Sequence, residues 1–489
     1  MRFRSLVLLV VVVGVAAMAV RPAFDTDTWW HLRAGQWIVE HRQVPRVDPF
    51  SSTMRGSPWT YPGWLAQVVM LEFYRVGGLV GLTAFSAILV GVAFLFLWPL
   101  LEGPLLLRAA LLLLAAATSA VYWAARPHLA SFALAAIFYW ALERRRRDSR
   151  SRAIWLLPLA MALWVNLHGG FAIGVILLLM VLGGALVDLF AAPARHFGTW
   201  SEAWHLRRGE IGTHFAVLLL CLAASTANPH GPAILAYPFK TVSIPVLQAY
   251  IQEWQSPDFR TPQLLPFLAM LLLLIVALGL SRKSTATAEW ITTAGWTGLA
   301  LIAVRNIPVF ALVAAPVMAR HISAALQPEG GAAMAGKPDP ERRGLNTALG
   351  AGLLMILLAW VALQASPGRN RAQLEAQVPV DAVAAMRQVK PNGILFNDYN
   401  WGGYLLWELY PGYAPFVDGR TDVYSSAVFE DYLVLWAARA GWERVLERWD
   451  IGVVLLPPQS PLVAALDGVG WEERFRDDQA VILVRPGTS

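Results

Sequence analysis

Several polar side chains in this sequence stand at the ends of apolar segments, where they could do chemistry. Asp25 and Asp27 follow the first apolar run, and either carboxylate could act as a general base on a hydroxyl or an amide. Arg126 lies in "ARPH" and Arg305 in "VRNIP", and two guanidinium groups could hold a phosphate by paired, charge-assisted hydrogen bonds. These residue types indicate proton transfer beside a phosphate-bearing substrate.

Three histidines occupy similar places along the chain. His128 in "ARPH", His168 in "NLHGG" and His230 in "NPHGP" could transfer protons, contact phosphate or bind a metal. Their spacing matches no compact metal motif, and a metal site would draw on Asp27, His128 and the Glu253 of "QEWQSPDF". Each motif also has a structural explanation, because Asn-Pro, Gly-Gly and Arg-Pro end helices for backbone reasons alone.

The elements that must position these residues are membrane helices. Of the 489 residues, 57% are hydrophobic and only 15% are charged, whereas soluble domains carry about 25% charged residues. Several runs approach the roughly 20 apolar residues that cross a bilayer. We expect about eleven spans, near residues 5–20, 64–101, 105–124, 128–142, 153–167, 170–190, 211–227, 262–280, 286–304, 306–322 and 345–365. The chain is therefore predicted to be an integral membrane protein.

Basic residues fall in short loops between the predicted spans, for example in "ERRRRDSRSR" (143–152) and "SRK" (281–283). Because such loops stay in the cytoplasm, the pattern predicts a cytoplasmic N-terminus in the plasma (inner) membrane and an extracytoplasmic C-terminus. It also accounts for the net charge of +6 without nucleic acid as a partner. The first span is short but is expected to be retained, not cleaved. Under this topology the candidate residues share one outer face.

Two domains are predicted, a multi-span transmembrane domain over 1–365 and an extracytoplasmic α/β domain over 366–489. The first carries long outer loops at 21–63 and 228–261 and a Gly/Pro-rich cytoplasmic connection at 327–344. In the second, "NGILF", "IGVVLLPP" and "AVILVRP" are typical of buried strands. The run "AVFEDYLVLWAARAGWERVLERW" has the apolar spacing of an amphipathic helix.

Three segments resemble motifs of oligosaccharyltransferase catalytic subunits. "DTWWHLRAGQWIVEHRQVPRVDPFS" is similar to the first outer loop of that family, with Asp27 at the place of its catalytic acid and Arg33 at that of its arginine. "YIQEWQSPDF" is similar to the motif of its second long outer loop, with Glu253 at the glutamate. "NDYNWGGYLLWELYPGYAPFVDGRTD" is similar to the start of its outer C-terminal domain. The candidates for acceptor contact in this last segment are Trp401, Tyr404, Asp418 and Arg420.

The segments follow the order and the membrane side of that family, and the α-helical polytopic architecture resembles the wider GT-C class of glycosyltransferases. The resemblance implies a polyprenyl-phosphate- or pyrophosphate-linked sugar donor and inverting transfer to a glycan, lipid or protein acceptor, in contact with membrane lipids. Asp27 would be the catalytic acid or base, with Asp25 as its alternative and Glu253 beside it. The donor phosphate would be held by Arg126, Arg305, His168, His230 and Arg33.

The sequence also departs from the family pattern. The second acidic motif of the family has no counterpart in "ARPHLAS", so the need for a divalent cation, Mg²⁺ or Mn²⁺, stays open unless His128 replaces the acid. The aspartate that belongs to sequon recognition is missing from "YNWGGY", so asparagine-linked transfer does not follow.

Two other classes of protein stay open. A transporter or flippase for a lipid-linked glycan could use the same arginines without chemistry, although it would favour inverted repeats and none is evident. A non-catalytic assembly subunit of a cell-envelope complex would tolerate the loss of Asp27 but not the loss of the C-terminal domain.

Overall fold

The computed structural model describes residues 1–22, 25–196, 200–243, 251–326, 342–389 and 392–487. These residues form two compact units. The helical unit comprises Met1–Arg21, Thr83–Pro238 and Ile251–Ala365. The α/β unit comprises the described parts of Pro22–Leu82, Phe239–Tyr250 and Ser366–Ser489. Most of the predicted connection at 327–344 lies outside the described residues, as does 244–250 of the predicted loop at 228–261.

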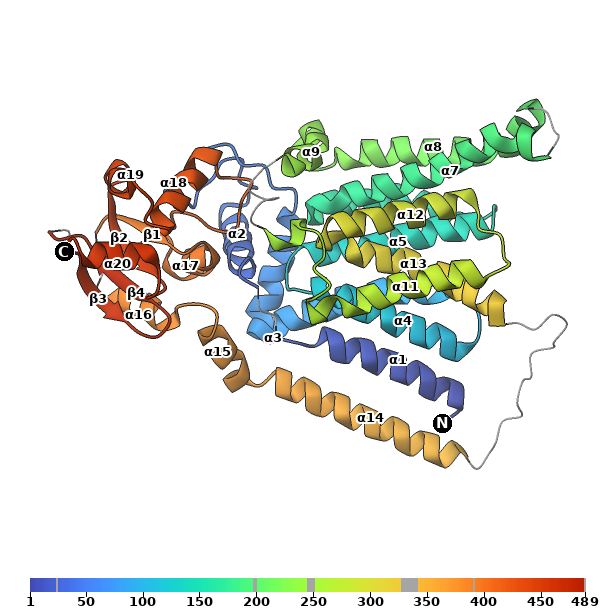
Figure 1. Ribbon diagram of the computed structural model, residues 1–489, viewed down its shortest axis with the longest axis horizontal. Coiled ribbons are helices and arrows are strands. Elements are labelled where there is room, and N and C mark those ends of the chain that lie inside the picture. The colour runs from blue at the N-terminus through green and yellow to red at the C-terminus, as the bar shows by residue number, and fades with distance from the viewer. Residues whose placement is uncertain (23–24, 197–199, 244–250, 327–341, 390–391, 488–489) are drawn as a thin grey trace. The chain divides into compact units, whose positions relative to one another are not determined.

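The helical unit is built from long apolar helices that run alongside one another (Figure 1). They are α1 (Phe3–Ala19), the later part of α3 (Trp64–Leu97), α4 (Leu105–Ser119), α5 (His128–Arg147), α6 (Leu157–Leu167), α7 (Ala172–His196), α8 (Trp200–Ser225), α11 (Leu265–Leu280), α12 (Thr287–Ile302), α13 (Ile307–Leu326) and α14 (Arg342–Gln364). Short 3-10 helices join them at Trp98–Leu100, Ala120–Tyr122, Ala153–Leu156, Gly169–Phe171, Gly231–Ala236, Gln252–Trp254, Pro262–Leu264 and Val304–Asn306, and α9 spans Tyr237–Val242.

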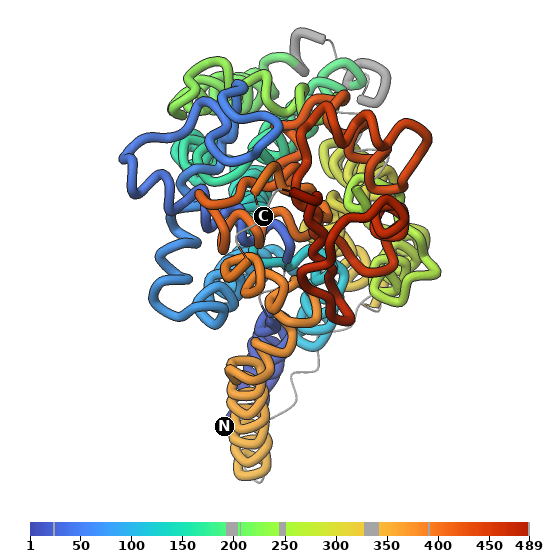
Figure 2. Tube along the Cα trace, turned by 90° about the vertical axis from the view of Figure 1, so that its left-hand side faces the viewer, coloured from blue at the N-terminus to red at the C-terminus, as the bar shows by residue number. Residues whose placement is uncertain are grey.

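Helix α13 is the core of the helical unit. Its residues from Ile307 to His321 are all buried, because it packs against α4, α5, α11 and α12. Helix α14 is the opposite case: it lies beside α1, where the Trp360 indole donates to the carbonyls of Ala17 and Val20 at 3.0 Å (Figure 2). Most of its other apolar side chains are exposed, as in a helix whose face contacts lipid.

Every predicted span coincides with a helix, but the count of about eleven spans is not confirmed. Six helices among the described residues are long and apolar enough to cross a membrane: those at Trp64–Leu100, Leu105–Tyr122, Gly169–Ala191, Pro262–Leu280, Val304–Leu326 and Arg342–Gln364. The predicted spans at 5–20 and 153–167 are shorter apolar helices, α12 has 16 residues, and α5 ends in four arginines. The protein is an integral membrane protein on the strength of these helices.

The α/β unit carries a four-stranded mixed sheet in the order β1-β2-β4-β3. The strands are β1 (Ile394–Asn397), β2 (Ile451–Leu456), β3 (Glu472–Arg476) and β4 (Val481–Val484). β1 and β2 are parallel, and β4 is antiparallel to both β2 and β3. All residues of β2 and β4 are buried, which explains why they are continuous apolar runs in the sequence. The predicted strands are thus confirmed.

Helices surround this sheet: α15 (Pro367–Glu375), α16 (Val380–Val389), α17 (Gly402–Leu409), α18 (Ser426–Trp436), α19 (Trp442–Arg448) and α20 (Pro461–Asp467), with a 3-10 helix at Tyr399–Trp401. The prediction of a single amphipathic helix after Ser426 is wrong in one respect, because this segment forms two helices, α18 and α19. Between them Ala438 and Gly441 have φ angles of 45° and 88°, which no α-helix accommodates. Strand β3 was not predicted from the sequence, because it is largely exposed and charged and its residues lack the apolar pattern of a strand.

The chain that follows α1 also belongs to the α/β unit. Helix α2 (Thr28–His41) packs against α17, where the backbone approaches so closely that a Cβ on Gly403 would lie 2.7 Å from the Thr26 carbonyl oxygen. Trp30, Phe50 and Trp59 enter the same buried apolar core as Phe416 of the C-terminal segment. Segments separated by more than 300 residues therefore form one core.

Candidate functional site

The described candidates fall into two groups, one in each unit. In the helical unit Arg126, Glu253 and Arg305 form an arginine–glutamate cluster. The Arg126 Nη2 lies 2.9 Å from the Glu253 Oε2, and the Arg305 Nη1 lies 3.8 Å from the Glu253 Oε1. Short turns before α5, at Gln252–Trp254 and before α13 position these side chains. All three side chains are mostly buried, with exposed fractions between 21% and 28%.

The Glu253 carboxylate is held ionised. Burial alone would raise its pKa, but the guanidinium groups of Arg126 and Arg305 lower the pKa of Glu253 to about 2. A carboxylate with so low a pKa is a poor proton acceptor near neutral pH. Glu253 lies between the two arginines and can hold both guanidinium groups in place. The Arg305 guanidinium also lies over the Trp254 ring, 4.0 Å from its centroid.

Two of the three histidines lie next to this cluster. The rings of His128 and His168 are 6.5 Å apart, and the His128 Nε2 contacts the Tyr122 carbonyl oxygen at 2.6 Å. The His168 Nδ1 accepts from the Gly170 N–H at 3.0 Å and lies 2.8 Å from the Ser131 Oγ.

The charge state of His168 follows from its surroundings. Burial, followed by the charge of Arg305, lowers the pKa of His168 to about 3. It is therefore neutral at physiological pH, and with Nδ1 accepting from Gly170 its other ring nitrogen carries the proton. It could donate a hydrogen bond there but could not supply positive charge.

His230 is placed by a different set of contacts. Its N–H donates to the Asn228 Oδ1 at 3.0 Å, and the Asn228 amide donates to the Val165 carbonyl at 2.9 Å. The turn after α8 is thus tied to the last turn of α6 at Val165, three residues before His168.

In the α/β unit Asp27 stands at the start of α2. Its backbone N–H donates to the Asp25 Oδ1 at 2.9 Å, so Asp25 shapes the turn that presents Asp27. The Asp27 carboxylate lies against Gly419: a Cβ built there would be 1.8 Å from its Oδ1 and 3.1 Å from the Trp30 Nε1. The Trp30 Nε1 is buried and has no hydrogen-bond partner among the described residues. Gly419 was not foreseen from the sequence, since nothing in "VDGR" marks a contact with residue 27.

Arg33 and Tyr404 contact neighbouring aromatic or polar groups of the same unit. The Arg33 guanidinium lies 4.7 Å from the Tyr410 ring centroid and donates to the Gln36 Oε1 at 3.0 Å. The Tyr404 ring meets the Trp29 ring edge to face at 5.2 Å. Trp401 and Tyr404 are 6% and 4% exposed, so their side chains are mostly core.

Asp418 and Arg420, two of the predicted acceptor contacts, form a buried ion pair. Both side chains are fully buried. Arg420 donates to Asp418 through Nε at 2.8 Å and Nη2 at 2.6 Å and to the Asp48 Oδ1 through Nη1 at 2.6 Å. Its guanidinium lies 5.1 Å from the Phe50 and 5.0 Å from the Trp59 ring centroids. This network joins the loop after α2 to the C-terminal segment.

A second acid that the sequence did not mark is Asp422. Burial raises the pKa of Asp422 to about 6, against the lowering effect of Arg420. Sequence position alone gave no signal for this group, because the shift arises from burial in the folded chain and, to a smaller extent, from the charge of Asp418.

The described residues do not fit the divalent cation left open by the sequence. Among them no group of three or more His, Cys, Asp or Glu side chains is arranged to hold a metal ion. The Glu253 oxygens face arginines, and the His128 Nε2 faces the Tyr122 carbonyl. We therefore assign no step to a metal.

Comparison with known proteins gives a fold. No family model matches the chain, and no curated protein matches it in sequence. The oligosaccharyltransferase AglB from Archaeoglobus fulgidus, solved with an inhibitory peptide and a dolichol-phosphate, superposes with a TM-score of 0.56 at 12% identity, over 92% of this chain and 69% of that one. The fold is that of GT-C glycosyltransferases.

A second solved GT-C structure spans almost the whole of both chains. ArnT from Cupriavidus metallidurans, bound to undecaprenyl phosphate, superposes with a TM-score of 0.52 at 13% identity and covers 99% of this chain and 98% of its own. The resemblance to GT-C glycosyltransferases is thus confirmed for the fold, across both units of the chain.

Proposed function

We propose that this protein is a membrane glycosyltransferase that moves a sugar from a polyprenyl-phosphate or polyprenyl-pyrophosphate carrier to an acceptor on the extracytoplasmic face. The observation that carries the proposal is the GT-C fold, because two proteins that share it were solved with a dolichol-phosphate and with undecaprenyl phosphate. The acceptor class, a glycan, lipid or protein, follows the same analogy. The proposed topology places the N-terminus in the cytoplasm and the C-terminal segment outside the plasma (inner) membrane.

We assign proton transfer to Asp27. In an inverting transfer the acceptor oxygen or nitrogen attacks the anomeric carbon of the sugar, the bond from that carbon to the carrier phosphate breaks, and the acceptor loses a proton. Asp27 would take that proton, and the carrier would leave as a phosphate or pyrophosphate. The position of the carboxylate supports this role, since the Asp27 Oδ1 and the Trp30 Nε1–H donor both approach Gly419.

We assign the phosphate to the arginine–glutamate cluster. The single carboxylate of Glu253 contacts the guanidinium groups of both Arg126 and Arg305, so it offsets only one of their two positive charges. Guanidinium groups held in this way would stabilise the negative charge that develops on the leaving phosphate. The neutral His168 would add a hydrogen bond, and Arg33 and His230 stay secondary candidates.

The test is a surface-glycan profile by mass spectrometry of a deletion strain that is complemented with wild type, Asp27→Asn or Glu40→Gln at matched membrane abundance. Glu40 is an exposed acid on the same helix and serves as the matched control. General acid–base catalysis contributes about 100-fold to 10,000-fold in rate. We expect the glycan to return with wild type and Glu40→Gln and to stay below about one hundredth of that amount with Asp27→Asn.

Either of two results would count against this proposal. If Asp27→Asn restores the glycan fully, Asp27 is not catalytic, and a transporter or an assembly subunit becomes the better interpretation. If deletion changes no glycan, the proposed transfer itself is wrong.

A further inference from the structure

A polar cavity of about 410 Å³ lies in the helical unit, remote from the arginine–glutamate cluster. The cluster lies at the beginning of α5 and at the turn between α12 and α13, whereas the cavity lies where α5 ends and α12 begins. An α-helix rises 1.5 Å per residue, so the 20 residues of α5 separate its ends by about 30 Å. This is about the thickness of the apolar layer of a bilayer. The cavity and the cluster thus lie at opposite ends of α5.

The lining of the cavity is positively charged. It carries four cations, two carboxylates and two hydroxyl groups: Arg146, Arg147, Lys283, Arg320, Glu102, Glu289, Ser284 and Thr285. Four positive and two negative charges leave a net charge of +2. Glu143 adds one more carboxylate beside the lining, since it accepts from Arg146 at 2.9 and 2.7 Å. When Glu143 is included, the net charge around the cavity is +1.

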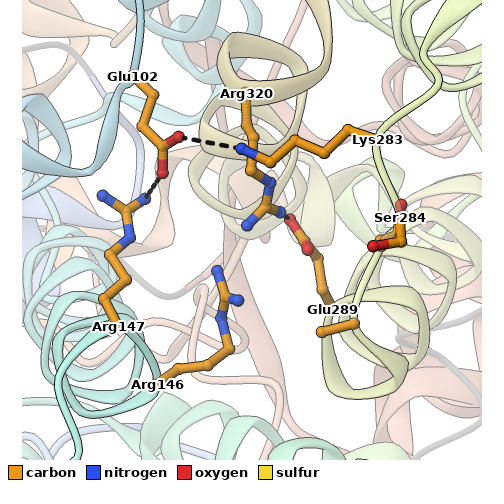
Figure 3. A pocket seen from close by; sticks show the side chains of 9 residues that line it. Glu102, Arg146, Arg147, Lys283, Ser284, Glu289 and Arg320 are labelled. Carbon is orange, nitrogen blue, oxygen red and sulfur yellow. Dashed lines mark ion pairs between the residues drawn. The ribbon is translucent and has the colours of Figure 1, made fainter. Parts of the chain in front are cut away.

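The cationic groups converge. Figure 3 shows the guanidinium groups of Arg146, Arg147 and Arg320 and the ammonium group of Lys283 directed toward one space. Glu102 bridges two of them, at 3.3 Å from Arg147 and 3.8 Å from Lys283, and Glu289 pairs with Arg320. Three of the four cations therefore share two carboxylates, and cation–cation repulsion is only partly offset.

Two features show unmet hydrogen-bonding capacity at this place. The side chain of Arg320 is 9% exposed, and its Nε has no hydrogen-bond partner among the described residues, nor does the Oε2 of Glu289, the residue with which it pairs. The segment Ser284–Ala286 leads directly into α12, whose 16 residues begin at Thr287. The first backbone N–H groups of a helix lack intrahelical acceptors and carry partial positive charge. Cations, a buried unpartnered donor and a helix start together favour an anion with several oxygens.

We propose that this cavity binds a phosphate group, either in the headgroup of an anionic membrane lipid or in a soluble phosphate compound. The volume admits more than a bare phosphate, because a water molecule occupies about 30 Å³ in the liquid. Bound there, the phosphate would neutralise the excess charge and link the end of α5 to the loop before α12. The inference does not rest on the proposed transfer reaction, because its test measures binding and not product.

The experiment uses the full-length purified protein and the double variant Arg147→Gln/Lys283→Gln. These side chains are 27% and 46% exposed, so their replacement spares the buried Arg320–Glu289 pair. Arg144→Gln is the matched control, because Arg144 is an exposed arginine of the same helix end that does not line the cavity. Native mass spectrometry of protein released from nanodiscs of phosphatidylglycerol and phosphatidylcholine reports retained lipid. Thermal unfolding in detergent with sodium phosphate or sodium chloride at equal ionic strength reports soluble phosphate.

A lipid headgroup predicts one phosphatidylglycerol per chain retained by wild type and Arg144→Gln, with retention at least tenfold lower in the double variant. A soluble ligand predicts no selective lipid, but an unfolding temperature that phosphate raises in wild type and Arg144→Gln and leaves unchanged in the double variant. If the double variant behaves as wild type in both measurements, or if wild type responds to neither probe, the cavity is an internal ion-pair network and the proposal is wrong.

Discussion

At the scale of residues, the contact between Asp27 and Gly419 makes a glycine part of the candidate site. We predict that Gly419→Ala lowers glycan output at least tenfold, because a Cβ would lie 1.8 Å from the Asp27 Oδ1 and the carboxylate must move away. A displacement of about 1 Å in a catalytic group can reduce a rate about 100-fold. The measurement is the glycan profile of the complemented deletion strain, together with the unfolding temperature of each purified variant.

Gly468→Ala provides the control for this substitution. The nearest atom to a Cβ at Gly468 is 3.4 Å away, which is ordinary van der Waals contact, so this variant should behave as wild type. Full activity of Gly419→Ala would show that the position of the Asp27 carboxylate is unimportant, and the catalytic assignment would then fail together with the prediction.

Asp422 gives a pH dependence whose sign follows from its pKa. Because folding raises the pKa of Asp422 from its usual value of 3.8 to about 6, the folded state binds the proton more tightly. The resulting stability is fully present below pH 3.8 and is lost as the pH rises through 6. We predict that Asp422→Asn, which cannot ionise, has a higher unfolding temperature than wild type at pH 7.5 and no such advantage at pH 4.

The quantity to measure is the difference in unfolding temperature between Asp422→Asn and wild type from pH 4 to pH 8, since the other titrating groups affect both proteins alike. Two pKa units correspond to about 3 kcal/mol at most. A difference that is constant with pH would mean that the Asp422 carboxyl is as well solvated in the folded state as in the unfolded one.

At the scale of elements, hydropathy was enough to predict a helix, because a helix makes its backbone hydrogen bonds within itself. Each of the eleven predicted apolar runs is helical, since a helix bonds its N–H and C=O groups internally wherever it lies, although the run 64–101 is kinked at Gly78. Strands β1, β2 and β4 could be predicted for a similar reason, as all but Ile394 of their residues are buried. Strand β3 could not, because it is an edge strand whose exposed charges give no apolar period.

The sequence was a poorer guide where tertiary contacts decide. The apolar spacing after Ser426 continues through the break between α18 and α19, so periodicity cannot show that Ala438 leaves the helix. The candidate residues divide similarly. Arg126 and Glu253 were predicted to share a face because the alternation of basic loops places both on the outer side, and they form an ion pair. The burial of Arg420 depends on Asp48, which lies 372 residues away and which no local pattern connects to it.

At the scale of the whole molecule, the chain folds as two units that each combine distant segments. The α/β unit takes its core from the loop after α1 and from the C-terminal segment, so it is completed only after the membrane helices between them have been synthesised. Its central polar link is Arg420 with Asp48 and Asp418, enclosed by Phe50 and Trp59. Contacts this far apart in sequence form late and depend on a correct fold elsewhere.

Arg420→Leu tests that link. Removing one member of a buried ion pair leaves the other charges buried without a partner and costs about 3 to 5 kcal/mol, a large part of the stability of a domain. We predict that limited proteolysis of the full-length variant cuts both 42–63 and 366–489 while the membrane helices stay intact. Arg439→Leu removes an exposed arginine of the same unit and should resist cleavage like wild type. Cleavage confined to 366–489 would contradict a shared core, because a core built from both segments exposes both when it opens.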